Sequence, residues 1–224
     1  KYFSQIKFKA ELAGSLTDFL ANQFNVKIDE FGNNKILGLV YSQYIKTEFS
    51  YVDYWAINSN SLIAFRSYFG IAVPFGNSNN IPFSKSFFAG GSNDNRAWEV
   101  YRLGPGISGA ISEFNEANMK IAMSIEYRFN LIGKLDGALF TDFGNIWNVF
   151  DNTNDPKRTF DSIKDLNEIA IGSGFGMRYN LGYFVLRLDM GLKTYNPVLK
   201  TKDRWLTDFN LKKAVFNIGL NYPF

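Results

Sequence analysis

The chain has 224 residues, of which 46% are hydrophobic, and its 24 basic and 21 acidic residues give a net charge of +3. This length suits one folded domain or a large part of one, and the even charge balance argues against a nucleic-acid-binding surface. The absence of cysteine and histidine excludes disulfides, thiolate or histidine metal sites, and nucleophiles activated by histidine. We therefore expect no metal, no other cofactor and no enzymatic activity.

The N-terminal sequence "KYFSQIKFKAEL" contains neither a start methionine nor a signal peptide, so Lys1 is not expected to be the natural beginning of the protein. No apolar run in the sequence approaches the roughly 18 to 20 residues of a membrane-spanning helix.

Alternation of apolar and polar residues with a period of two predicts about eight strands, each of about ten residues or more. In chain order the expected strands are residues 2–12, about 41–57, 62–75, 118–130, 134–147, 168–180, 182–193 and 212–224. The clearest is 118–130, "NMKIAMSIEYRFN", in which methionine, isoleucine, tyrosine and phenylalanine fall on one face and lysine, serine, glutamate and arginine on the other.

Both a soluble β-sandwich and a transmembrane β-barrel contain such alternation. Sandwich strands are usually nearer five or six residues and carry charge along most of the outer face. Here the strands are long, one face is apolar without a break, and the other mixes both charge signs with small residues. This pattern favours an antiparallel transmembrane barrel with its apolar side toward lipid.

The connections support a barrel because they differ in length at the two ends of the strands. "YRFNLIGKLDG" and "MRYNLGYFVL" leave only short turns, whereas residues 148–167 and 195–212 are long and polar, as in outer-membrane barrels. Aromatic residues near the strand ends are expected to form interfacial girdles: Tyr127, Phe129, Trp147, Tyr179, Tyr183, Tyr195 and Trp205.

Four separated motifs, "FFAGGSNDNRAW…LGPG", "IEYRF", "LFTDFGNIWN" and the terminal "NIGLNYPF", resemble the C-terminal barrel of the BamA/TamA-type outer-membrane assembly superfamily, also called the bacterial surface-antigen family. The "RAW" and "LGPG" loop is most similar to the TamL-type branch. The resemblance covers roughly residues 60–224, and residues 1–59 add no motif.

The resemblance implies that residues 1–224 are the C-terminal part of one outer-membrane barrel domain. The family's barrel has sixteen strands after periplasmic POTRA modules, so this chain supplies about the last eight strands, and the upstream strands and POTRA modules are expected elsewhere in the protein. A closed eight-stranded barrel remains the alternative.

The resemblance also implies that the long loop, residues 76–118, folds into the barrel lumen, where its arginine meets acidic residues of the wall. The matching residues, which we name the loop-lumen lock, are Arg96, Glu126 and Asp142. Strand alternation independently points Glu126 and Asp142 inward. The loop motif comprises Gly90, Gly91, Ala97, Trp98, Gly104, Pro105 and Gly106, and Ala97 stands where the family usually has glycine. The alternative is a solvated surface loop with Arg96 facing water.

The C-terminal residues Leu220, Tyr222 and Phe224 resemble the signal by which barrel precursors reach the assembly machinery. In the family's insertases this strand also closes an openable seam. Pro223 cannot donate a ladder hydrogen bond, so strand pairing is expected to fail near the chain end. The alternative is that Phe224 is an ordinary lipid-facing anchor.

The resemblance implies a non-enzymatic assembly or translocation factor in the Gram-negative outer membrane, acting through lateral opening of the barrel. Its expected partners are outer-membrane lipids, nascent outer-membrane or secreted polypeptides and a TamB-like periplasmic protein, but no nucleic acid. The alternatives are a two-partner-type polypeptide secretion pore and a general porin whose selectivity is set by inward charges, namely Lys120, Arg128, Arg178, Arg187 and Asp189. A lipid-modifying barrel enzyme is disfavoured because histidine is absent.

Overall fold

The computed structural model describes residues 3–23, 28, 30, 32–36, 38–110 and 112–220. Eight antiparallel strands form one sheet in the order β1-β4-β5-β6-β7-β8-β9-β10. The strands are β1 (Phe3–Ala13), β4 (Tyr44–Asn58), β5 (Ser61–Pro74), β6 (Met119–Ile132), β7 (Leu135–Trp147), β8 (Ala170–Asn180), β9 (Val185–Tyr195) and β10 (Val215–Gly219). The predicted all-β fold with eight long strands is confirmed, although the described part of β10 is shorter than expected.

The remaining elements are small and lie in the connections. They are α1 (Ser15–Gln23), the two-stranded pair β2 (Lys35–Ile36) and β3 (Leu39–Val40), and the 3-10 turns η1 (Phe83–Lys85), η2 (Ile163–Glu168), η3 (Thr201–Asp203) and η4 (Leu211–Lys213). None of these was predicted from the sequence, because none shows a sustained period. No helix within the described residues has the length and apolar character needed to cross a membrane.

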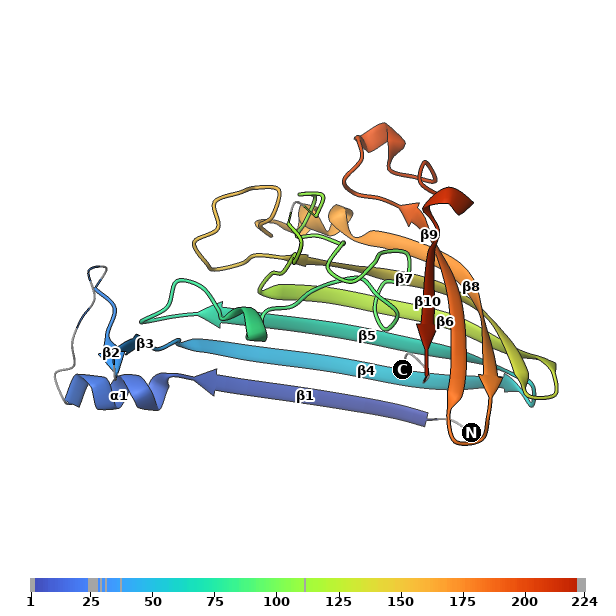
Figure 1. Ribbon diagram of the computed structural model, residues 1–224, viewed down its shortest axis with the longest axis horizontal. Helices are drawn as coiled ribbons and strands as arrows, with labels where there is room; N and C mark the ends of the chain where they lie inside the picture. The colour runs from blue at the N-terminus through green and yellow to red at the C-terminus, as the bar shows by residue number, and fades with distance from the viewer. Residues whose placement is uncertain are drawn as a thin grey trace.

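The connections lie at opposite ends of the sheet according to their length. The β4–β5, β6–β7 and β8–β9 turns are short and share one end, whereas the long loops gather at the other (Figure 1). The sheet curls into a trough, and the long loop between β5 and β6, residues 75–118, turns back into it (Figure 1).

The sheet buries its charged side chains and exposes its large apolar ones, which is the reverse of the pattern found in a soluble protein. On β6 the inward-facing Ser124, Glu126 and Arg128 are buried, while the outward-facing Ile125 and Tyr127 are exposed. Burial of charge and exposure of large apolar side chains is costly in water but is the expected arrangement when lipid surrounds the sheet. The convex face is therefore the lipid-facing surface.

One predicted girdle residue lies elsewhere. Trp147 is completely buried rather than exposed to the interface, because the β7–β8 loop folds over it and places Phe160 edge-on to its ring, with centroids 5.5 Å apart. Tyr183 and Trp205, in contrast, are exposed.

Candidate functional site: the loop inside the barrel wall

Arg96 is the centre of the contact between the long loop and the barrel wall. Its side chain is only 1% exposed. Its Nε and Nη2 donate hydrogen bonds of 2.8 Å to the two carboxylate oxygens of Asp142 on β7, and its backbone N–H donates to the same carboxylate at 3.0 Å. This two-pronged geometry is the strongest form of an arginine–carboxylate pair. The guanidinium carbon also lies 3.4 Å from the ring centroid of Phe140.

Glu126 on β6 holds the other side of the guanidinium. Arg96 Nη1 donates to Glu126 Oε2 at 2.5 Å, so the structure brings together all three residues of the loop-lumen lock. Ser124 donates its hydroxyl to Asp142 Oδ1 at 2.5 Å. Every oxygen of these two carboxylates is therefore committed to a neighbour, which is how a buried charge becomes tolerable.

The site is larger than the lock that the sequence predicted. Arg178 on β8 joins Glu126 to Asp189, with N–O distances of 3.0 and 2.5 Å. Asp189 on β9 also pairs with Arg187 at 3.1 Å, and Arg128 pairs with Glu126 at 2.7 Å. The network thus contains four arginines and three carboxylates, joined by side chains that are all at least nine-tenths buried. From the sequence alone, Arg128, Arg178, Arg187 and Asp189 are expected only as inward charges that could line a pore.

Glycines in the wall make room for the loop. A Cβ built on Gly191 of β9 would lie 2.5 Å from the carbonyl carbon of Arg96, and one on Gly172 of β8 would lie 2.5 Å from the Cβ of Ala97. Both distances are below any normal contact, so residues 95–97 lie directly on strand backbone. The glycines on the polar faces of β8 and β9 therefore determine how closely the loop approaches the wall.

The remaining residues of the loop motif build the loop itself. Trp98 and Ala97 are buried in an apolar cluster with Phe87, Leu103 and Ile146. The four motif glycines, Gly90, Gly91, Gly104 and Gly106, all have positive φ, which explains the choice of glycine there. Ala97 is not among the residues with positive φ. Alanine in place of the family's usual glycine is therefore compatible with this backbone.

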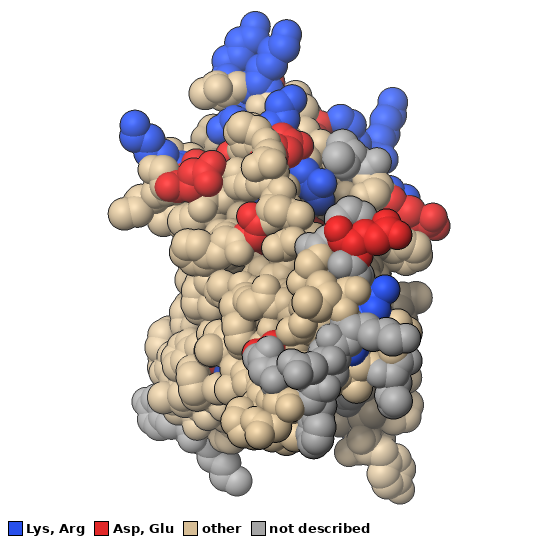
Figure 2. All heavy atoms as spheres, turned by 90° about the vertical axis from the view of Figure 1, so that its left-hand side faces the viewer, with Lys and Arg blue, Asp and Glu red and all other residues tan. Residues whose placement is uncertain are grey.

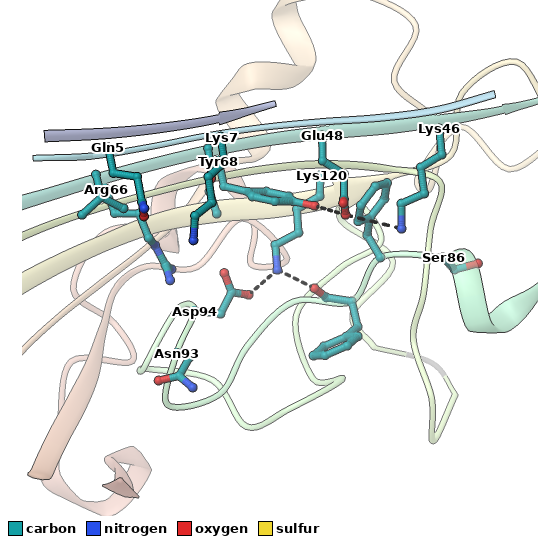
Figure 3. Close-up of a pocket in the computed structure, with 15 residues that line it drawn as sticks. Gln5, Lys7, Lys46, Glu48, Arg66, Tyr68, Ser86, Asn93, Asp94 and Lys120 are labelled. Atoms are coloured by element: carbon teal, nitrogen blue, oxygen red, sulfur yellow. Dashed lines mark hydrogen bonds and ion pairs between the residues drawn. The ribbon is translucent and has the colours of Figure 1, made fainter. Parts of the chain in front are cut away.

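A second contact holds the loop nearer to β5. Figure 3 shows Lys120 of β6 reaching across to the loop, where its Nζ lies 3.1 Å from an oxygen of Asp94 and donates to the Phe88 carbonyl at 2.7 Å. Asp94 in turn accepts a hydrogen bond from the backbone of Gly90 at 2.8 Å. Lys120 thus fixes the turn that precedes Arg96.

The loop also contacts the last strand of the sheet. Asn217 Nδ2 on β10 donates to the backbone oxygen of Arg96 at 3.0 Å. The described part of β10 pairs with β9 over only five residue positions. Leu220 follows the strand and is exposed, whereas Tyr222 and Phe224 lie outside the described residues.

The β7–β8 loop contains a half-buried carboxylate, Glu168. Its Oε2 accepts a hydrogen bond of 2.9 Å from the indole Nε1 of Trp147. Burial raises the pKa of Glu168 above its ordinary value, and Asp165 acts in the same direction, although the indole hydrogen bond opposes them. The loop therefore holds this carboxyl group at an energetic cost when it is ionised.

A family model described as "Omp85 superfamily domain" matches residues 22–221. The structure is similar to the crystal structure of BamA from Haemophilus ducreyi lacking POTRA domains 1-3, with a TM-score of 0.53 and 15% sequence identity. The match covers 85% of this chain and 47% of that one, so the chain spans about half the length of the protein it matches. No curated protein sequence matches the chain.

Proposed function

The chain belongs to the Omp85 superfamily, whose model matches it over residues 22–221, and we propose that it helps to insert or translocate polypeptides at the outer membrane through a barrel seam that opens laterally. The superfamily places the chain in the outer membrane of a Gram-negative-type cell, in a family of non-enzymatic assembly and transport proteins. Membership of the TamL-type branch stays a prediction.

The observation that carries this proposal is the position of Arg96. A buried ion network holds the loop inside the lumen. Asn217 joins the same loop to β10, an edge strand whose described part pairs with β9 over only five positions. The loop therefore connects the lumen to the strand that would form the seam. An edge strand with free backbone groups can template an incoming strand. We propose that Leu220, Tyr222 and Phe224 belong to this seam.

We further propose that residues 1–224 form the C-terminal part of one barrel domain, with other strands and POTRA modules completing the protein. In the described sheet, β1 and β10 each pair with one neighbour and not with each other. Further strands between these two edges would complete the wall. The proposed partners are outer-membrane lipids, nascent outer-membrane or secreted polypeptides and a TamB-like periplasmic protein.

A secretion pore of the two-partner type is the second candidate, because a loop inside the lumen can also act as a plug. A general porin is less compatible with the structure, since Arg128, Arg178, Arg187 and Asp189 are buried in the ion network and do not line open water.

The experiment that tests the proposal is depletion of the full-length protein, followed by quantitative proteomics of the outer membrane. Rescue is attempted with the wild type, with Arg96→Ala, and with Lys200→Ala as a surface control. An assembly role that depends on the loop predicts that depletion lowers the amounts of many other barrel proteins. Wild type and Lys200→Ala should restore these amounts, and Arg96→Ala should not. An unchanged set of barrels with one missing secreted protein would indicate the secretion pore instead.

A further inference from the structure

A pocket distinct from the ion network lies where the long loop meets the loop ends of β9 and β10. Its volume is about 490 Å³, within the range of small-molecule sites, and its walls come from Trp98, Glu99 and Arg102 of the loop, Lys193 of β9, and Lys212 and Lys213 before β10. Three segments far apart in the sequence therefore converge on one space.

The charge of this pocket is strongly unbalanced, because four cationic side chains line it together with one carboxylate, Glu99. Lys213 has its own partner, Asp208. Arg102, Lys193 and Lys212 form no ion pair with any residue that the structure describes. The pocket thus presents three cations that lack a carboxylate partner.

Lys193 shows that this charge is not simply a solvated surface. Its side chain is half-buried, and its Nζ lies 5.3 Å from the ring centroid of Trp98. A cation–π contact offsets only part of the cost of removing an ammonium from water. An anion in the pocket would complete the compensation, and it would be held by a guanidinium fork and two ammonium groups, a donor set suited to phosphate.

The surroundings indicate where such a phosphate comes from. Phe216 and Leu211, next to the pocket in sequence, are 74% and 72% exposed, and strand alternation places Phe216 on the lipid-facing side of β10 while Val215 lines the pocket. Figure 2 shows Lys and Arg side chains standing out at the top of the loop end, at the height of the β9–β10 loop in Figure 1. Basic residues beside an apolar lipid-facing surface are the usual setting for a charged lipid headgroup.

We propose that this pocket binds the phosphate of a phosphorylated lipid headgroup from the outer leaflet. Because its walls include both the long loop and the residues that lead into β10, the bound headgroup would brace the loop against the last strand. This inference goes beyond the proposed function and depends only on the location of the protein in the outer membrane.

The test uses the purified full-length protein in detergent, with lipid binding measured by native mass spectrometry. The probes are monophosphoryl lipid A, the same lipid after removal of its phosphate, and inorganic phosphate alone, and polyglutamate is added as a competitor of the lipid. The double variant Arg102→Gln with Lys212→Gln changes two exposed residues and leaves half-buried Lys193 in place. Lys200→Gln with Lys202→Gln removes the same charge from exposed positions at and just before η3, and is the matched control.

We expect the phosphorylated lipid to bind, the dephosphorylated lipid not to bind, and the double variant to weaken binding about tenfold through loss of charge-assisted hydrogen bonds. The control pair should stay within about twofold, since exposed charges outside the pocket contribute little. Equal binding of both lipids, or equal losses in the two double variants, would overturn the proposal. Saturation of the pocket by inorganic phosphate, without lipid binding, would show a free-phosphate site. Displacement of the lipid by polyglutamate at equal concentration would favour an acidic polypeptide as the ligand. Either result would reject the lipid headgroup as the ligand.

Discussion

Asn217 on the last strand donates a 3.0 Å hydrogen bond to the backbone oxygen of Arg96 in the long loop, across 121 positions of the chain. The Arg96 side chain faces the other way, into the carboxylates of β6 and β7. A single loop residue is therefore held by an edge strand through its backbone and by the barrel wall through its side chain.

Replacement of Asn217 by leucine should remove the contact between the loop and β10 and make transient undocking of Arg96 from the ion network more frequent. The Arg96 carbonyl would lose a buried partner, a change that costs about 1–3 kcal/mol. The measurement is the rate at which trypsin cleaves after Arg96 in the folded, membrane-embedded protein, which should rise. Asn154→Leu, in an exposed part of the β7–β8 loop, is the control, and equal cleavage rates in the two variants would show that the hydrogen bond does not hold the loop.

Arg96 and Asp142 should behave as one unit in a double-mutant cycle. Either Arg96→Ala or Asp142→Asn removes one partner of a buried pair, which typically costs about 3–5 kcal/mol. The double variant should cost far less than the sum of the two, as read from unfolding midpoints in urea. The exposed pair Lys85–Glu11, at 2.6 Å, supplies the comparison and should show coupling close to zero. Fully additive losses for Arg96 and Asp142 would contradict the pairing.

Gly191→Ala should displace the loop although it adds a single methyl group. The new Cβ would lie 2.5 Å and 2.7 Å from backbone atoms of Arg96 and Ala97, which cannot move aside as a side chain can, and overpacking of this kind costs about 1–3 kcal/mol. In Gly137→Ala of β7 the methyl would meet only side-chain ends, the nearest being the Phe129 ring at 2.8 Å. Faster tryptic cleavage after Arg96 is expected for Gly191→Ala alone; unchanged cleavage would mean that the loop does not need this close approach.

Glu168→Gln should stabilise the β7–β8 loop at neutral pH. Because burial raises the pKa of Glu168 in the folded protein, its contribution to stability is greatest at low pH. That contribution is lost as pH rises from the ordinary value of 4.5 through the raised pKa. Glutamine can still accept the Trp147 hydrogen bond but does not ionise, so unfolding followed by tryptophan fluorescence should depend less on pH in this window. Glu113→Gln, on an exposed part of the long loop, should leave the profile unchanged. A profile unaltered by Glu168→Gln would show that this carboxyl group does not influence the loop.

Strand alternation predicted most of the sheet because the direction of a side chain in a strand is a local property. It placed Glu126 and Asp142 inward without reference to any relative, and the structure shows both buried on the polar face. The resemblance supplied Arg96 as their partner, which no local pattern could have done, since the residue lies in a loop without a period.

The rest of the site depends on what fills the lumen, and strand patterns do not contain that information. Alternation correctly places Arg178, Arg187 and Asp189 inward, but it gives the direction of a side chain and not its partners. Their ion pairs connect β6, β8 and β9, and the docked loop adds Arg96, which brings Asp142 into the same network. Trp147 is expected at the lipid interface from its place at a strand end, and strand position does not show that a loop covers it. The loop that covers it is mostly polar in sequence, and the apolar residues that it contributes to the Trp147 cluster, Val149, Phe160 and Ile169, are widely spaced.

The residues that hold Arg96 all follow it in the sequence: Glu126, Asp142, Asp189 and Asn217. During synthesis Arg96 is therefore made before any of these partners, and its contacts close over separations of up to 121 residues. Contacts of such long range form late in folding. The Asn217 contact is the only one of these that needs β10. A precursor that stalls before β10 would therefore hold Arg96 by the wall alone, and its long loop would leave the lumen more readily than in the finished sheet.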